Sequence, residues 1–307
     1  MTDSQWKIFS TFKKELKEKC DEWNKVAAEL IPLQKETSCE DTPDYPIENA
    51  IVYNTALDEL TPDSEIKLIV IGDNPGKSEQ LNINQKYLVG QAGKLADGFF
   101  KKHPELEIDF RKNVIILNKT PIHSAKTKHL SKIEKSLGSK NSPAAKLIHD
   151  SQIWMAQKTA QLHIDLFNAA LATYTEQSKT TTFATYTDQS KSDSSATCAG
   201  PSNIPFLPEL WLVGYSELKP RGLFLPYRDT LAQTYNGQPK STFATYTDQS
   251  KSTVTPIDPW SCVFVYQHFS MNCFNKDITN HQAANSSLSL KQFLEHLGNI
   301  HKAEIFS

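Results

Sequence analysis

Four polar side chains follow apolar runs in this sequence and have types that suit hydrolytic chemistry. Asp73 and Asn74 come after the run at 68–71, Asn118 ends the run at 114–117, and His268 closely follows the run at 262–266. A carboxylate orients or deprotonates water, an amide both donates and accepts hydrogen bonds, and an imidazole stabilises developing negative charge. Taken singly, Asn118 fits a turn and His268 fits a structural histidine, so only their combination indicates a functional site.

The turn after the first run is rich in glycine and invites comparison with a phosphate-binding loop. Residues 72–78 read GDNPGKS, and the phosphate-loop motif requires a glycine five residues before Gly76. Ile71 occupies that position, so the loop is one residue short. A hydrolase that binds nucleotides or phosphate at this loop is therefore the weakest of the candidate functions.

Three blocks of the chain, in order, resemble the uracil-DNA glycosylase superfamily. The branch with the pattern G-E-x-P-G-x-x-E followed by F-V-G-x-A-G-x-L is similar to residues 72–79 (GDNPGKSE) and 88–95 (LVGQAGKL). Asn74 with the following Pro-Gly also resembles the N-P-G turn of the mismatch-specific branches. Asn118 matches the family's uracil-reading asparagine, and residues 268–271 (HFSM) resemble its H-P-S motif.

The resemblance implies hydrolysis of the N-glycosidic bond of a deaminated base that is flipped out of DNA. His268 would stabilise the leaving base, and either Asp73 or Asn74 would position water; the sequence leaves that choice open. The implied catalytic residues are Asp73, Asn74 and His268; the substrate-binding residues are Gly72, Pro75, Gly76, Tyr87, Leu88, Gly90, Gly93 and Asn118. The DNA-binding residues would be Lys119, His123, Lys126, Lys128, Ser270 and Met271, with Met271 as an apolar wedge.

The chain departs from the family pattern at three places. Leu88 stands where the family has the aromatic residue that stacks on uracil, so either Tyr87 substitutes or stacking is weakened. Phe269 replaces the proline of the H-P-S motif. The cysteines that hold a four-iron cluster in many members are missing, so we expect no cluster, no other metal and no cofactor. These departures keep open a second function, that of a catalytically silent relative that binds DNA or protein.

Bulk composition is compatible with a globular protein of ordinary charge. The 307 residues are 38% hydrophobic and 10% aromatic, and the formal net charge is -2, which gives no global reason to bind nucleic acid. No run approaches a membrane span, and the N-terminus lacks the apolar core of a secretory signal. Five scattered cysteines without a C-x-x-C pair fit reduced thiols. We expect a cytoplasmic monomer with DNA as its partner and no membrane association.

Apolar runs alternate with amphipathic segments along the chain. Strands are expected at 66–71, 113–118, 210–213 and 262–266, and helices at 3–31, 92–103, 143–171, 227–235 and 288–297. This alternation predicts an α/β protein, with three α/β/α layers around a mostly parallel central sheet of about four strands. Residues 1–49 form an N-terminal helical extension and loop, and residues 50–307 form the glycosylase-like domain.

Two segments of this domain carry a repeat. ATYTEQSK begins at residue 172, and ATYTDQSK begins at 184 and again at 244. The repeats are rich in Thr, Ser, Gln and Lys, so we interpret 172–203 and 236–255 as largely disordered low-complexity insertions. Each follows a predicted helix and precedes a predicted strand, which places it at the amino-terminal edge of a parallel sheet, opposite the usual site.

Overall fold

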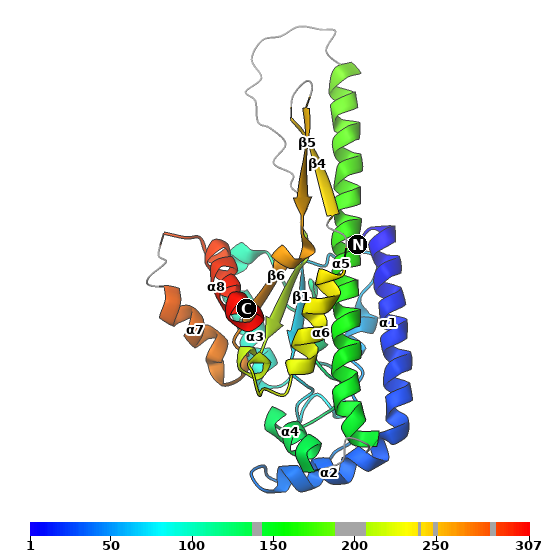
Figure 1. Cartoon of the computed structure of the whole chain (residues 1–307), viewed down its shortest axis with the longest axis vertical. Coiled ribbons are helices and arrows are strands. Elements are labelled where there is room, and N and C mark those ends of the chain that lie inside the picture. The colour runs from blue at the N-terminus through cyan, green and yellow to red at the C-terminus, as the bar shows by residue number, and fades with distance from the viewer. Residues whose placement is uncertain (137–142, 188–206, 239–240, 248–250, 283–286) are drawn as a thin grey trace.

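The protein is built on a parallel sheet of four strands in the order β2-β1-β3-β6 (Figure 1). The structure is a computed structural model that describes residues 1–136, 143–187, 207–238, 241–247, 251–282 and 287–307. The central strands are β1 (Leu68–Gly72), β2 (Val114–Asn118), β3 (Glu209–Val213) and β6 (Val263–Tyr266). The expected α/β architecture and all four expected strands are confirmed, with strand ends shifted by at most two residues.

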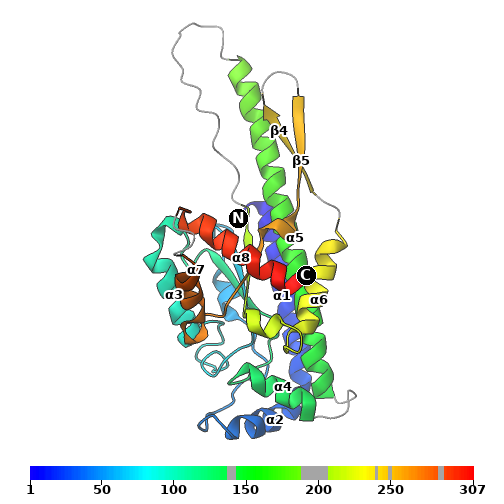
Figure 2. The same cartoon turned by 60° about the vertical axis from the view of Figure 1, so that its left-hand side comes forward.

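Helices cover both faces of the sheet and complete three layers. The helices are α1 (Asp3–Trp23), α2 (Ala27–Cys39), α3 (Gln91–Lys102), α4 (Thr127–Ser136), α5 (Pro143–Thr187), α6 (Leu225–Asn236), α7 (Cys273–Gln282) and α8 (Leu290–Phe306). In Figures 1 and 2, α1, α5 and α6 lie on one side of the sheet, and α3, α7 and α8 lie on the other.

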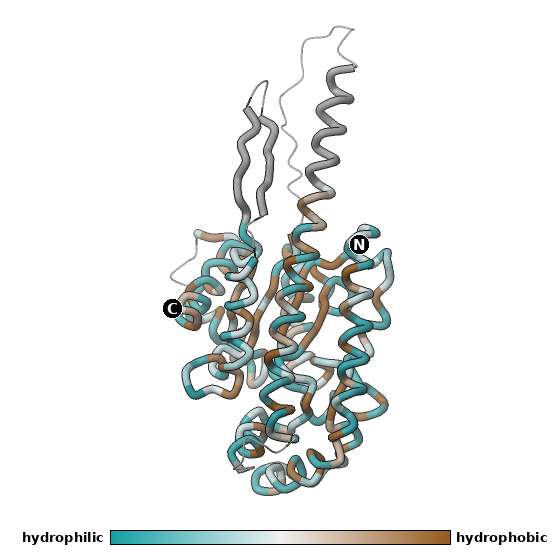
Figure 3. Tube along the Cα trace, turned by 45° about the vertical axis from the view of Figure 1, so that its right-hand side comes forward, coloured by the Kyte–Doolittle hydropathy of each residue, from teal (hydrophilic) through white to brown (hydrophobic). Residues whose placement is uncertain are grey.

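The strands are buried on both faces because each face packs against its own helices. Alternate residues such as Ile69 and Ile71 join a core cluster with α1, α5 and α6, while Leu68 and Val70 join a second cluster with α3, α7 and α8. Figure 3 shows the central strands as hydrophobic segments. Strands that are covered on both faces have unbroken apolar sequences, and for that reason their positions could be predicted from the sequence.

Helix α2 differs from expectation because it continues through Pro32 to Cys39, whereas the expected helix ends at residue 31. Tertiary contacts offset the hydrogen bond that proline removes from a helix. Buried Gln34 donates from Nε2 to the backbone oxygen of His123 at 2.8 Å and to that of Ala50 at 3.3 Å. Helix α2 is thereby attached to the loop that follows β2.

The two repeat segments are the second difference. The structure describes a helix and two strands in parts of these segments, which we interpreted as low-complexity insertions: α5 continues to Thr187, and β4 (Ser241–Thr247) pairs antiparallel with β5 (Lys251–Ile257). Thr, Tyr, Phe and Val favour strands, and a hairpin satisfies its backbone groups without a large core. Residues 188–206, 239–240 and 248–250 lie outside the described part. Both segments project from the same end of the molecule in Figures 1 and 2.

Within the described residues, no helix combines the length and the apolar character needed to cross a membrane.

Candidate functional site

The parallel register brings the predicted site residues to one edge of the sheet. Gly72 at the end of β1 pairs with Asn118 at the end of β2, and Val213 at the end of β3 pairs with Tyr266 at the end of β6. The loops that begin at 73, 119, 214 and 267 therefore leave the same carboxyl edge, where open α/β sheets bind ligands. The hairpin and the end of α5 lie at the opposite end, as the sequence predicted for the insertions (Figure 1).

Asp73 is held by a lysine from the neighbouring strand. Lys119 is fully buried, and its Nζ donates to Asp73 Oδ1 at 2.5 Å and to the backbone oxygen of Val213 at 2.5 Å. Burial lowers the pKa of Lys119, and the Asp73 charge opposes that shift. Gly214 has φ 93° and lies against this pair, since a Cβ there would come within 2.2 Å of Asp73 Oδ1. The Lys119 ammonium group thus joins the ends of β1 and β2 through an ion pair and the end of β3 through a hydrogen bond.

Asn118 presents an amide nitrogen that lacks a partner. Its side chain is 2% exposed, and Nδ2 is a buried atom with no hydrogen bond in the described structure. The amide packs directly over Gly72, where a Cβ would come within 2.4 Å of Asn118 Oδ1. Buried donors are nearly always satisfied, so an orphaned one at a sheet edge is a group that a ligand carbonyl would complete.

His268 is held in a defined tautomer by the turn that follows it. The backbone N–H of Ser270 donates to Nδ1 at 3.0 Å, and the Ser270 hydroxyl lies 2.8 Å from the same atom. Because Nδ1 accepts, the proton of the neutral ring is on Nε2. Burial lowers the pKa of His268, while Asp73 raises it and Lys119 lowers it. The result is a neutral imidazole with a hydrogen-bond donor on Nε2, and the charges of Asp73 and Lys119 act on it in opposite directions.

Asn74 braces two loops. Its Nδ2 donates to the Ser124 hydroxyl at 2.9 Å and to the backbone oxygen of Pro75 at 3.1 Å, and its Oδ1 accepts from the Thr127 hydroxyl at 3.0 Å. Thr127 begins α4, so the amide connects the loop after β1 to that helix. Because both ends of the Asn74 amide are already hydrogen-bonded, this side chain is better suited to holding the two loops in place than to activating water.

Tyr87 and Leu88 are core residues, which contradicts the expectation that one of them stacks on a base. Tyr87 is 1% exposed and donates from its hydroxyl to the backbone oxygen of Val52 at 2.5 Å, and Leu88 is 3% exposed. Arg111 Nη2 donates to the Leu88 oxygen at 2.6 Å. Gly93 is required beside that oxygen, because a Cβ would come within 1.4 Å of it. Gly90 is the N-cap residue of α3.

The glycine-rich loop is closed by an acidic residue. Glu79 Oε2 accepts from the backbone N–H of Gly76 at 3.1 Å, and Glu79 is 6% exposed. Burial raises the pKa of Glu79 to about 7, against the opposing effect of its backbone hydrogen bonds and Arg111. The carboxylate thus takes the Gly76 N–H that a phosphate would need, which agrees with the failed spacing of the phosphate-loop motif.

The residues expected to contact DNA divide into buried and exposed groups. The expectation is wrong for Lys119 and His123, which are fully buried; His123 Nδ1 lies 2.9 Å from the Pro75 oxygen. Lys126 and Lys128 are at the surface, where both pair with Asp41. The exposed group also includes Met271, whereas Ser270 is partly buried against the His268 ring.

Met271 is 79% exposed and has φ 50°. Such a backbone conformation in a non-glycine residue carries strain, which is commonest at functional sites. The side chain therefore remains a candidate for contact with a partner.

Sequence reasoning missed several supporting residues. Gly214 was detectable as a glycine that directly follows a parallel strand, and Glu79 lay within the matched motif. Ser124 and Thr127 gave no signal, since single hydroxyl residues are common in loops. Among the described residues, no group of three or more His, Cys, Asp or Glu side chains is arranged to hold a metal ion.

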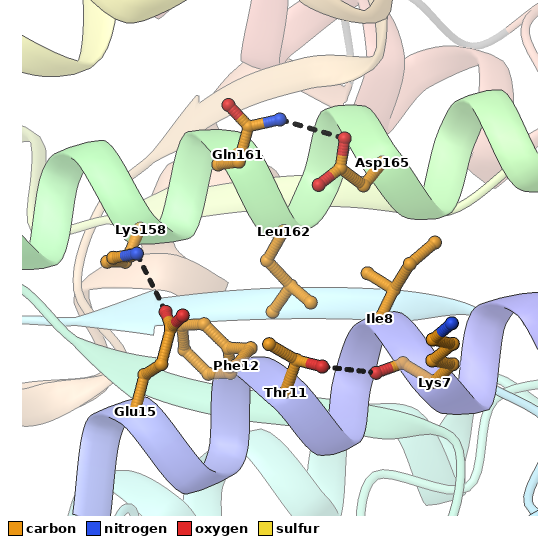
Figure 4. Close-up of a pocket in the computed structure, with 9 residues that line it drawn as sticks. All are labelled: Lys7, Ile8, Thr11, Phe12, Glu15, Lys158, Gln161, Leu162 and Asp165. Carbon is orange, nitrogen blue, oxygen red and sulfur yellow. Dashed lines mark hydrogen bonds and ion pairs between the residues drawn. The ribbon is translucent and has the colours of Figure 1, made fainter. Parts of the chain in front are cut away.

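A cavity of about 300 Å³ lies between α1 and α5 and contains none of the predicted site residues (Figure 4). Ile8, Phe12 and Leu162 provide apolar walls, and Lys158 pairs with Glu15 at 2.7 Å. A second cavity of about 490 Å³ lies further along the same two helices. These positions differ from the sheet edge where the polar site residues converge.

No protein-family model matches the chain, and no match is found among curated proteins or among solved structures.

Proposed function

We propose that the protein is a uracil-DNA glycosylase-like enzyme that hydrolyses the N-glycosidic bond of a flipped, deaminated base. The observation that carries the proposal is the orphaned Asn118 Nδ2 at the same sheet edge as the neutral His268 ring. A base with a ring carbonyl would accept from Asn118 Nδ2, whereas the amino group of cytosine offers a donor in that place. Sites with buried polar groups strongly reject ligands that leave those groups unpaired.

The proposed reaction breaks the bond between C1′ and the base nitrogen while water attacks C1′. The bonding electrons pass to the base, and His268 Nε2–H donates to the carbonyl oxygen on which negative charge develops. Of the two candidates for water, we favour Asp73 over Asn74, because the Asn74 amide already braces Ser124 and Thr127. The Asp73 oxygen that does not contact Lys119 would accept the water proton and face the positively charged sugar.

A direct assay tests this proposal. The purified protein is incubated with single- and double-stranded oligonucleotides that contain uracil, and alkali-labile abasic sites are counted. We expect His268→Ala to lower the rate about 10²–10³-fold and Asn118→Ala to lower it about 10²-fold or more. His149→Ala, at an exposed position on α5, is the matched control and keeps the wild-type rate.

A catalytically silent DNA-binding relative is the second candidate, because Tyr87 and Leu88 offer no surface for base stacking. If the wild type produces no abasic sites above the His268→Ala background, the enzymatic proposal is wrong. Retention of labelled DNA in that case, measured by fluorescence anisotropy, would support the silent relative.

A further inference from the structure

One carboxylate at the end of α2 gathers three donors from the start of α4. Asp41 lies in the turn directly after α2, and helices α2 and α4 are neighbours at the end of the molecule opposite the hairpin (Figures 1 and 2). His129 Nε2 lies 2.9 Å from Asp41 Oδ1. Lys126 Nζ lies 3.3 Å from Oδ2, and Lys128 pairs with that same oxygen. We call Lys126, Lys128 and His129 the donor cluster.

His129 gives the donor cluster a fixed geometry. Hydrogen bonds from Lys128 and His129 hold the pKa of the Asp41 carboxyl well below its usual range, so the group is an anion at neutral pH. An ionised carboxylate only accepts, so His129 Nε2 carries a proton in this contact. The His129 side chain is 1% exposed, and without an acceptor its N–H would be a buried donor left unpaired. A group that displaces Asp41 must therefore bring an oxygen that accepts.

The two lysines of the cluster remain open to solvent. Their side chains are 47% and 57% exposed, whereas that of Asp41 is 26% exposed. Glu40 pairs with Lys132, so the two acidic residues that follow α2 face three lysines of residues 126–132. Positive charge is therefore in excess at this surface. Exposed ion pairs are weak, so their partners can exchange.

The donor cluster is attached to the loop that carries Asp73. Asn74, the next residue, accepts from Thr127 Oγ1 at 3.0 Å and donates to Ser124 Oγ at 2.9 Å. The Ser124 hydroxyl donates in turn to the backbone oxygen of Lys126 at 2.9 Å. A strand with one nucleotide at the candidate site would therefore carry a neighbouring phosphate toward the donor cluster.

We propose that the donor cluster binds a phosphodiester group of a nucleic-acid strand and that Asp41 occupies the same site as an intramolecular competitor. A phosphate oxygen takes the place of Asp41 Oδ1 on His129, and the two ammonium groups exchange a carboxylate for a phosphate. The choice of nucleic acid rests on the proposed function. Because the competitor must be displaced, the wild type binds a strand more weakly than its lysines would allow.

Asp41→Asn tests the competitor, and Asp44→Asn is the matched control. Both variants change the net charge equally, and Asp44 is exposed just beyond the same turn. Binding of a labelled single-stranded oligonucleotide without uracil is measured by fluorescence anisotropy over a series of salt concentrations. Release of two ammonium groups should steepen the slope of log K against log salt by about 1.4 and tighten binding roughly tenfold or more near 0.1 M salt. We expect Asp44→Asn to change the affinity by less than about threefold, because salt screens exposed charges.

Two further measurements examine the lysines. Lys126→Met together with Lys128→Met, introduced into Asp41→Asn, should abolish the gain in affinity. In the unaltered wild type, the oligonucleotide should protect both lysines from acetylation more than it protects Lys14, which is 76% exposed on α1. Far-ultraviolet circular dichroism confirms that each variant is folded.

Equal affinities of Asp41→Asn and Asp44→Asn would overturn the proposal, as would a gain that survives the loss of both lysines. If Asp41→Asn gains affinity for inorganic phosphate, measured by calorimetry, but not for the oligonucleotide, the site takes a free anion and the assignment to a nucleic-acid strand is wrong. The oligonucleotide lacks uracil, so this result is separate from the enzymatic proposal. A gain without abasic sites in the glycosylase assay refutes only the enzyme, and abasic sites without a gain refute only the competitor.

Discussion

Replacement of Lys119 by methionine tests whether the Asp73–Lys119 pair holds the candidate site together. Methionine keeps much of the aliphatic length of lysine but removes the ammonium group, which donates to Asp73 and to Val213 and lies 5.0 Å from the Phe224 ring. The Asp73 side chain is only 11% exposed and would lose its counter-charge. Removal of one partner from a buried pair leaves the other charge uncompensated, so we expect a loss of about 3–5 kcal/mol in the free energy of unfolding.

The assay is urea denaturation at pH 7, followed by circular dichroism. Lys126→Met is the matched control, because Lys126 pairs with Asp41 at the surface and such pairs contribute less than about 1 kcal/mol. Asp73→Asn alone also destabilises, since it leaves the Lys119 ammonium buried without its carboxylate. The double variant removes both charges, and we expect it to lose about 2 kcal/mol less than the sum of the single variants.

Two outcomes would refute this reasoning. One is a Lys119→Met variant that loses no more stability than Lys126→Met. The other is strict additivity of Lys119→Met and Asp73→Asn, which would mean that the two groups do not stabilise each other. Either result would mean that the Asp73–Lys119 pair does not hold the candidate site together.

Three further substitutions have definite signs. Glu79→Gln removes a carboxyl whose pKa is raised by burial to about 7 in the folded state, so the folded state binds the proton more tightly than the unfolded state. Wild-type stability therefore falls relative to this variant between about pH 4.5 and 7, by roughly 3 kcal/mol in all, as measured by paired urea denaturation at each pH. Gly214→Ala forces a side chain into a backbone with φ 93° and against the Asp73 carboxylate, so we expect a loss of about 2–3 kcal/mol in the free energy of unfolding. Gly76→Ala is its control, because a Cβ there meets no atom within 4 Å and the denaturation midpoint should change little. Gly98→Ala, in the interior of α3 with equal space, raises the midpoint through a gain of about 0.5–1 kcal/mol, and a lower midpoint would show that the helix is more crowded there.

The sheet and the convergence of its loops were predictable because they depend on local apolar runs and on general rules of topology. Residues 68–71 and 114–117 are uninterrupted apolar segments, and parallel pairing carries the polar residues that follow them to one edge. The positions of Asp73, Asn118 and His268 followed from that rule alone.

Burial of the individual polar residues could not be predicted in the same way. Lys119 lies next to Asn118 in a segment rich in lysine, and nothing in the sequence distinguishes it from Lys126, which is exposed. Its burial depends on the oxygen of Val213, a contact between residues 94 positions apart. Tyr87 was misjudged for the same reason, since its ring is fixed by the distant Val52. Contacts at long sequence separation determine which polar groups remain available.

Asn118 is a paired residue of strand β2, and this position affects how base selection and catalysis would each respond to mutation. Its backbone is the last paired residue of β2, opposite Gly72, whereas His268 and Met271 lie in a turn beyond β6. The group that would choose the base is therefore a paired residue of the sheet, whereas His268 belongs to the turn that follows the last strand. We expect loop substitutions around residues 269–272 to alter the rate while leaving base preference unchanged, because preference is built into the sheet.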